Sequence, residues 1–185
     1  MHARQLVITF NAAQYLAVES VSEERHELVD GHILAMAGGS RLHSATCARV
    51  VRRLDEALSP GCTVFQSDMR VHVSASGAYF YPDAAVVCGA ATGAGDQAID
   101  NPTVVVEVLS PSTSGYDRGE KVLHYQRIPA ARDLVLVDPD ARRVAHWYRT
   151  GKDSPWQYED RVHDVLVLRG CAVEIPVAHL FVELV

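Results

Sequence analysis

Two acidic residues interrupt stretches of strand-forming apolar residues. Asp83 directly precedes Ala84-Ala85-Val86-Val87, and Glu107 lies inside Val104-Val105-Val106-Glu107-Val108-Leu109. An unpaired carboxylate is costly to bury, so each of these residues requires a partner. If adjacent strands bring both carboxylates to a common edge, the pair suits Mg²⁺ or Mn²⁺, which keep water ligands and engage phosphate. The alternative is that each carboxylate is satisfied by a backbone amide or an arginine at a strand end.

Two further charged residues could complete such a site. Lys121 belongs to the segment after the Glu107 strand, and a short loop could fold its ammonium group back to orient a water or to stabilise charge on a phosphate. The pattern alone favours a simpler interpretation, in which Lys121 pairs with Asp117 on a solvated helix face. Glu27 similarly has a simple interpretation as part of a charged surface with Glu23 and Glu24.

The apolar periodicity predicts the elements that carry these residues. Asn11 precedes a short N-terminal helix, and a hairpin with an Asp30-Gly31 turn follows within residues 25–37. Ser40 begins a long amphipathic helix that ends before Pro60-Gly61. Alternation then predicts two antiparallel strands, one over residues 69–73 and one over residues 79–88, with a loop over residues 89–101.

The second half of the chain continues as mixed α/β. The β-branched run at residues 103–109 predicts a central strand covered on both faces, and residues 116–128 predict a helix that ends at Pro129. Two strands joined by a turn follow at residues 134–137 and 144–148. Residues 156–158 and 165–168 predict edge strands, and Leu180-Phe181 a short final helix.

Length and composition restrict the class of protein. The 185 residues suffice for one domain with a real core, so we expect a single domain over residues 1–185. A content of 48% hydrophobic and 22% charged residues is that of a folded globular protein rather than a disordered one. The formal net charge of −6 argues against a protein that coats nucleic acid by bulk positive charge. An anionic partner must therefore be held locally.

The cysteines and the apolar segments indicate a cellular compartment. The four cysteines include no CxxC pair, so we expect reduced thiols rather than a zinc knuckle or a disulfide framework: Cys47, Cys62, Cys88 and Cys171. The N-terminus lacks a basic region followed by an apolar core, and the apolar stretch over residues 84–91 is too short to span a bilayer. We therefore expect a cytoplasmic protein with no membrane partner.

Taken in order, these residues resemble a known family. Pro82-Asp83, the segment Glu107-Val108-Leu109-Ser110-Pro111-Ser112-Thr113, and the spaced residues Asp117, Lys121 and Tyr125 are similar to the Uma-two family of putative restriction endonucleases, in the PD-(D/E)XK nuclease superfamily. The motifs that also match are Glu27-Leu28-Val29-Asp30-Gly31, His43 and Val137-Asp138-Pro139. The resemblance extends from about residue 10 to the C-terminus.

The resemblance implies a fold and a set of site residues. The fold would be α/β, with a restriction-endonuclease-like central mixed β-sheet flanked by helices, an N-terminal helix and hairpin, and extra C-terminal strands. The implied metal ligands are Asp83, Glu107, the backbone carbonyl of Val108, and Glu27, which would act through a metal-bound water. The superfamily's usual lysine position is occupied here by Leu109, and the resemblance implies that Lys121 supplies the lysine instead.

The resemblance also implies an activity. Mg²⁺ or Mn²⁺ held by Asp83 and Glu107 would activate a water for hydrolysis of DNA phosphodiester bonds, with Lys121 assisting. His43 could touch the substrate, although a histidine at the start of a helix is more often structural or exposed to solvent. Cutting both strands of a duplex would favour a homodimer. Two alternatives stay open at this point. One is a catalytically silent nuclease-fold module that binds nucleic acid or protein, and the other is a small phosphohydrolase acting on nucleotides.

Overall fold

The structure is a computed structural model that describes residues 9–36, 38–93, 95–110, 115 and 117–184. Pro111, Ser112 and Thr113 of the sequence motif, and Tyr116 at the start of the expected helix, lie outside the described residues. Within the described ranges, no helix is both long enough and apolar enough to cross a membrane.

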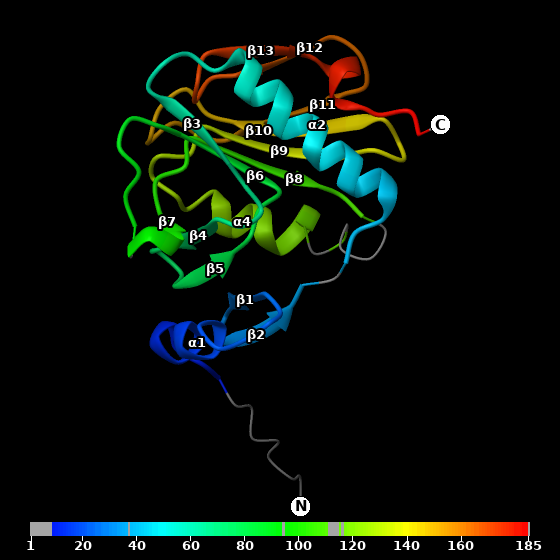
Figure 1. Cartoon of the computed structure of the whole chain (residues 1–185). Coiled ribbons are helices and arrows are strands. Elements are labelled where there is room, and N and C mark those ends of the chain that lie inside the picture. Colours follow the sequence, from blue (N-terminus) through cyan, green and yellow to red (C-terminus); the bar gives the residue numbers. More distant parts are fainter. Residues whose placement is uncertain (1–8, 37, 94, 111–114, 116, 185) are drawn as a thin grey trace, which may run out of the picture.

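A six-stranded mixed sheet forms the centre of the molecule (Figure 1). Its strands lie in the order β11-β10-β9-β8-β6-β3, and β8 runs parallel to β9 but antiparallel to β6. The bounds are β3 Cys62–Gln66, β6 Ala84–Cys88, β8 Val104–Val108, β9 Asp133–Asp138, β10 Arg143–Tyr148 and β11 Gln157–Arg161. The predicted central strand is confirmed, since β8 lies inside this sheet.

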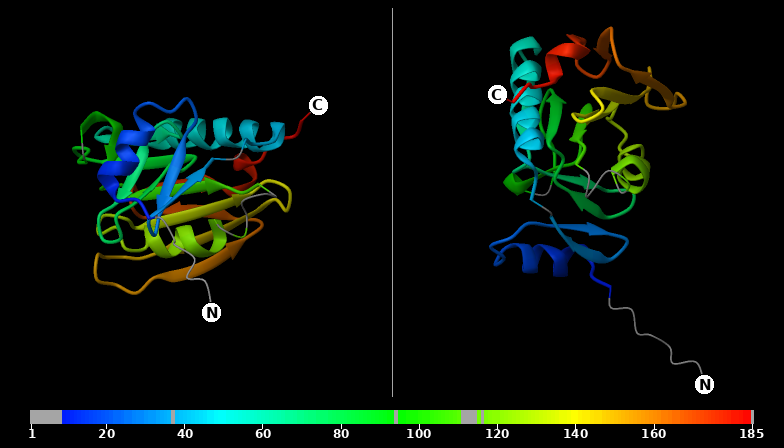
Figure 2. Two further views of the ribbon diagram at one scale, coloured as in Figure 1. Left: turned by 90° about the horizontal axis from the view of Figure 1, so that it is seen from below. Right: turned by 90° about the vertical axis from the view of Figure 1, so that its right-hand side faces the viewer.

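Both faces of β8 are covered, as its β-branched residues on either side of Glu107 predict. Val104, Val106 and Val108 pack in a cluster with Val50 and Leu54 of helix α2 (Arg41–Ala57). Val105, whose side chain points to the other face of the sheet, packs in a second cluster with helix α4 (Val122–Tyr125). Figure 2 shows α2 and α4 on opposite sides of the central sheet. Ser40 accepts a hydrogen bond from the His43 N–H and caps α2 as predicted.

A second sheet of five strands carries the N-terminal elements. Its order is β2-β1-β5-β4-β7, with bounds β1 His26–Val29, β2 His32–Ala35, β4 Arg70–Val73, β5 Ala78–Phe80 and β7 Ala98–Ile99. The predicted hairpin is confirmed, and Asp30 and Gly31 both take positive φ in its turn. Helix α1 (Ala12–Glu19) begins at Asn11, whose side chain accepts from the Gln14 N–H. Strand β1 pairs antiparallel with β5 through Leu28 opposite Tyr79, so the hairpin extends the sheet that β4 and β5 form.

Several predicted boundaries differ from the structure. The strand expected over residues 79–88 is two strands, β5 and β6, which belong to different sheets. Pro82 lies at the break, because it has no N–H to continue a ladder. The strands β3 and β7 were not predicted, and β7 lies in the expected loop. Residues 165–168 form no edge strand of the central sheet but pair as β12 (Val165–Leu168) with β13 (Val173–Pro176), before the short helix η3 (Val177–Leu180).

The expectation of four reduced cysteines is wrong for this structure. Cys62 of β3 lies opposite Cys88 of β6 in the antiparallel register, with their Cα atoms 4.0 Å apart, and the two are joined by a disulfide. Cys47 and Cys171 are free. Sequence spacing did not predict this pair because the register of β3 against β6, and not the separation along the chain, brings the sulfurs together.

Candidate active site

The strand register places the two acidic residues opposite each other. Strand β6 pairs with β8 through Ala84 opposite Val106. Continuing that antiparallel register by one residue sets Asp83 opposite Glu107, and side chains at opposite positions lie on the same face of a sheet. The Val108 N–H donates a 2.7 Å hydrogen bond to Asp83 Oδ2, which holds the aspartate across the end of the ladder. The predicted convergence of Asp83 and Glu107 at one edge therefore follows from strand pairing.

Glu107 is buried, with 4% of its surface exposed. The Tyr125 hydroxyl donates to Glu107 Oε1 at 2.7 Å, and Lys121 Nζ lies 3.2 Å from the same oxygen. Burial raises the pKa of Glu107 to about 8 despite the opposing effect of Lys121, and the nearby Asp83 carboxylate adds to the rise. The positive charge of Lys121 therefore offsets the burial of this carboxylate only in part.

Lys121 comes from a π-helical turn, η2 (Asp117–Lys121), that leads into α4. Its ammonium nitrogen lies 2.8 Å from Glu27 Oε1 and 3.4 Å from Asp117 Oδ1, in addition to its contact with Glu107. Burial lowers the pKa of Lys121, but these carboxylates outweigh burial and raise it well above its ordinary value. The interpretation of Lys121 and Asp117 as a solvated surface pair is wrong, because both side chains are buried within the site.

Glu27 reaches the site from the second sheet. It lies on β1 with 5% of its surface exposed, and its Oε1 also accepts a hydrogen bond of 3.3 Å from the Tyr81 N–H. Its interpretation as part of a charged surface is therefore wrong. The hairpin brings Glu27 next to Lys121, so the site is built where the two sheets meet.

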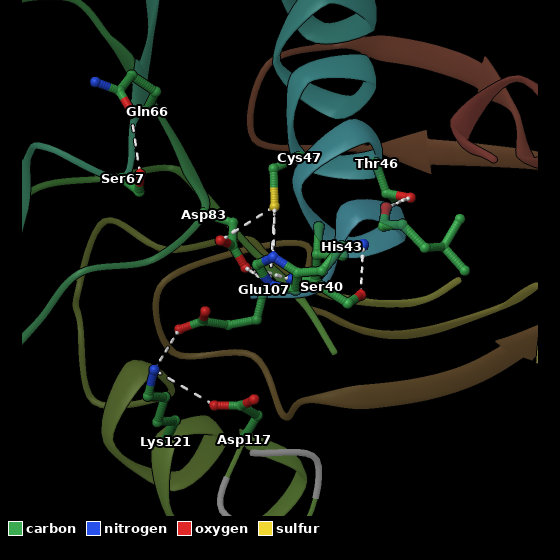
Figure 3. A network of polar contacts seen from close by, with 12 residues as sticks. Ser40, His43, Thr46, Cys47, Gln66, Ser67, Asp83, Glu107, Asp117 and Lys121 are labelled. Atoms are coloured by element: carbon green, nitrogen blue, oxygen red, sulfur yellow. Dashed lines mark hydrogen bonds and ion pairs between the residues drawn. The ribbon is translucent and has the colours of Figure 1, made fainter. Parts of the chain in front are cut away.

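Helix α2 supplies a second group of polar side chains on the other side of Asp83 (Figure 3). The Cys47 thiol donates to Asp83 Oδ1 at 3.3 Å, and His43 Nε2 lies 3.6 Å from Asp83 Oδ2. The hydrogen bond with Asp83 raises the pKa of His43, while burial raises the pKa of the Cys47 thiol. The sequence offered His43 as a substrate contact beside a structural role for it, but Cys47 was not singled out. The signal that could have found Cys47 is its position one helical turn after His43.

The acidic residues, Lys121 and His43 line one pocket of about 280 Å³, whereas Cys47 and Tyr125 lie behind its wall. Among the described residues, its wall carries His43, one lysine, Lys121, and four carboxylates: Glu27, Asp83, Glu107 and Asp117. The end of β2 and Gly38 and Gly39 complete the rim. Because carboxylates outnumber cationic groups in this pocket, the pocket is suited to a divalent cation.

A family model described as "Uma2: Putative restriction endonuclease" matches residues 12–175, which include every residue of the pocket. The chain belongs to the Uma2 family. Two relatives from Synechocystis sp. (strain ATCC 27184 / PCC 6803 / Kazusa) are similar to it. Uncharacterized protein sll1609 is 34% identical over 148 residues, covering 78% of this chain and 83% of the relative. Uncharacterized protein slr1290 is 36% identical over 144 residues, covering 77% and 75%.

A solved structure supports the fold assignment of this Uma2 chain. A putative nuclease belonging to DUF820 from Anabaena variabilis ATCC 29413 superposes with a TM-score of 0.73, covering 92% of this chain and 97% of that one at 18% identity. The expected fold is confirmed: a restriction-endonuclease-like mixed sheet flanked by helices, with an N-terminal helix and hairpin and additional C-terminal strands.

The position two residues after Glu107, where the resemblance places the superfamily's usual lysine, lies in the apolar core. Leu109 is 3% exposed and packs in the apolar cluster with Val122 and Tyr125, so a lysine there would have to displace core contacts. Lys121 approaches the same face of β8 from η2 and contacts Glu107 directly. Tyr125, one helical turn after Lys121, is also buried and donates a hydrogen bond to Glu107 Oε1.

Proposed function

We propose that this Uma2 protein is a metal-dependent endonuclease that hydrolyses DNA phosphodiester bonds. One observation carries the proposal: Asp83 before β6, Glu107 of β8 and Lys121 of η2 line one pocket. Three unrelated surface charges would not be expected to meet in this way. The membership of a restriction-endonuclease-like family supports nuclease chemistry rather than another hydrolysis.

The donor set of the pocket fits Mg²⁺ or Mn²⁺. Both ions prefer oxygen ligands, and the residues proposed to hold them are Asp83, Glu107, the carbonyl of Val108 and, through a water, Glu27. The raised pKa of Glu107 supports the same assignment, because a bound cation would compensate the buried carboxylate. When bound, the ion would polarise the scissile phosphate and lower the pKa of a water.

The side chains of the chain itself have separate roles in this proposal. Lys121 would orient the attacking water or neutralise charge that develops on the phosphate. Tyr125 is a positioning residue, because its hydroxyl holds Glu107 Oε1. His43 lies on the pocket wall and would contact the substrate, a role that Asp83 supports by raising the pKa of His43 so that it carries more positive charge. A homodimer would place two such sites for cleavage of both strands.

A silent nuclease-fold module is the second candidate. The observation in its favour is that Lys121 contacts three carboxylates, so the cluster could serve only to join the two sheets. This candidate predicts that the protein does not cleave DNA, whether or not it binds it. The two candidates therefore differ in one measurable property, cleavage.

The decisive experiment incubates the purified protein with plasmid and single-stranded DNA in Mg²⁺, Mn²⁺ or EDTA. Asp83→Asn and Lys121→Met should abolish cleavage. Asp140→Asn and Lys152→Met are matched controls, since both residues are exposed and lie outside the pocket, and they should cut normally. Cleavage that survives both site variants rejects the assignment, and no cleavage of any substrate favours the silent module. Light scattering during the same preparation tests the homodimer.

A further inference from the structure

We propose that His43, Cys47 and Asp83 form a thiol-containing metal site that takes a borderline-soft divalent ion such as Zn²⁺ or Co²⁺. This site goes beyond the proposed Mg²⁺ or Mn²⁺ site and shares only Asp83 with it. The three donors come from α2 and from the residue before β6, whereas Glu107 and Lys121 lie on the other side of Asp83 (Figure 3). Its existence does not depend on nuclease activity.

The distances between the donor atoms match those of a tetrahedral site. With His43 Nε2 as the imidazole donor, this nitrogen lies 3.8 Å from Cys47 Sγ and 3.6 Å from Asp83 Oδ2, and Cys47 Sγ lies 3.3 Å from Asp83 Oδ1. The three residues each offer a donor atom within 4.8 Å of the others. Zinc bonds of about 2.0 to 2.3 Å in a tetrahedron separate neighbouring ligand atoms by roughly 3.3 to 3.8 Å. The three donors are therefore already close to the separations that a tetrahedral ion requires.

The local structure holds two of the ligands in place. His43 and Cys47 are one turn apart on α2, so both side chains project from the same face of the helix. Gly39 allows the imidazole to lie close to the preceding backbone, since a Cβ there would come within 2.5 Å of His43 Nδ1. Cys47 is a free thiol, because the disulfide of this chain uses Cys62 and Cys88.

The types of donor select the class of metal. A thiolate and an imidazole suit Zn²⁺ or Co²⁺, whereas Mg²⁺ and Mn²⁺ prefer oxygen ligands alone. His43 and Asp83 also line the pocket, so a bound ion would be accessible to water or substrate as its remaining ligand. Three protein ligands with one open position is the composition of an open zinc site rather than a closed structural one.

The test uses Co²⁺ as a spectroscopic probe and Zn²⁺ as its competitor. Metal-free protein is titrated without reductant, so that Cys62 and Cys88 stay bonded, and the thiolate-to-Co²⁺ charge-transfer band is recorded. We expect one Co²⁺ per chain, a thiolate band, and loss of the band when Zn²⁺ is added. Cys47→Ser should abolish the band, while Cys171→Ser, which removes the other free thiol, should retain it.

Zn²⁺ affinity gives a second readout. Cys47→Ser should weaken Zn²⁺ binding by more than about 100-fold, because losing an outer partner of a metal ligand already costs about 10- to 100-fold. His43→Gln should weaken it similarly. Absence of a thiolate band, or equal Zn²⁺ affinity in wild type and Cys47→Ser with both folded by circular dichroism, overturns the proposal. Glu107→Gln separates it from the nuclease proposal, since this variant should lose cleavage and still give the cobalt band.

Discussion

Lys121 Nζ lies 2.8 Å from Glu27 Oε1, and this contact joins the turn after the central strand to the N-terminal hairpin. Both side chains are buried, so the ion pair is protected from screening by solvent. The same ammonium group contacts Glu107 of β8. One lysine therefore connects the two sheets at the place where the pocket is formed.

Removal of the Lys121 charge should destabilise the protein in EDTA. Lys121→Met leaves buried carboxylates without their cation, and breaking a buried pair from one side costs about 3 to 5 kcal/mol. Urea denaturation measures the loss. Adding Glu27→Gln to Lys121→Met should recover part of it, because one uncompensated charge is then gone. Lys152→Met, at an exposed position, should change the free energy of unfolding by less than about 0.5 kcal/mol. Equal stability of Lys121→Met and wild type would contradict this account.

The stability of the metal-free protein should fall as the pH rises through neutrality. Burial raises the pKa of Glu107 to about 8 in the folded state, above its ordinary value of 4.5, so the folded state holds a proton that the unfolded chain has lost between these two values. The free energy of unfolding contributed by Glu107 is therefore greatest below pH 4.5 and declines up to about pH 8. Urea denaturation at several pH values in EDTA measures the slope. Glu107→Gln should flatten it, and an identical slope in the variant would refute the assignment.

A buried pair outside the pocket should be important for stability alone. Asp133 and His146 are fully buried, with Asp133 Oδ1 2.9 Å from His146 Nε2, and Asp133 Oδ2 accepts a 2.6 Å hydrogen bond from the Gly170 N–H. Asp133→Ala leaves both partners unsatisfied, at a cost of about 3 kcal/mol. Thermal denaturation should show the loss, with a smaller one for the isosteric Asp133→Asn and none for exposed Asp140→Asn. Cobalt binding by the folded fraction should be unchanged, and its loss would mean that the pair acts on the site.

The disulfide between Cys62 and Cys88 should contribute about 2 to 4 kcal/mol to stability, because it restricts the unfolded chain over a separation of 26 residues. Thiol titration of the denatured, unreduced protein should count two free thiols, and prior reduction should raise the count to four. Reduction should lower the midpoint of urea denaturation for wild type. The double variant Cys62→Ser/Cys88→Ser should not respond to reductant. Four thiols without reduction would show that the bond is absent in solution.

Local patterns in the chain predicted much of the fold. Three of its features depend only on neighbours a few residues away along the chain: the apolar period of α2, the Asp30-Gly31 turn and the β-branched run around Glu107. They can therefore be predicted from the sequence alone. Asp83 and Glu107 were recognisable as site residues for a related reason, since a carboxylate inside a strand pattern conflicts with its surroundings. A carboxylate in such a position predicts that a hydrogen-bond or charge partner lies beside it in the folded protein.

Only the tertiary structure decides which residues become the partners of these carboxylates. Spacing favoured Asp117 as a solvated partner of Lys121, whereas packing buries the pair and adds Glu27 from the other sheet. Register alone brought Cys62 to Cys88, and the approach of α2 to the end of β6 brought Cys47 to Asp83. Such contacts join residues far apart in the chain, and their energies depend on burial and on distances of a few ångströms. The sequence by itself determined the main helix, the hairpin, the central strand and the acidic residues that needed partners. The tertiary structure decided which lysine, which cysteine and which sheet would meet them, because those contacts join distant parts of the chain.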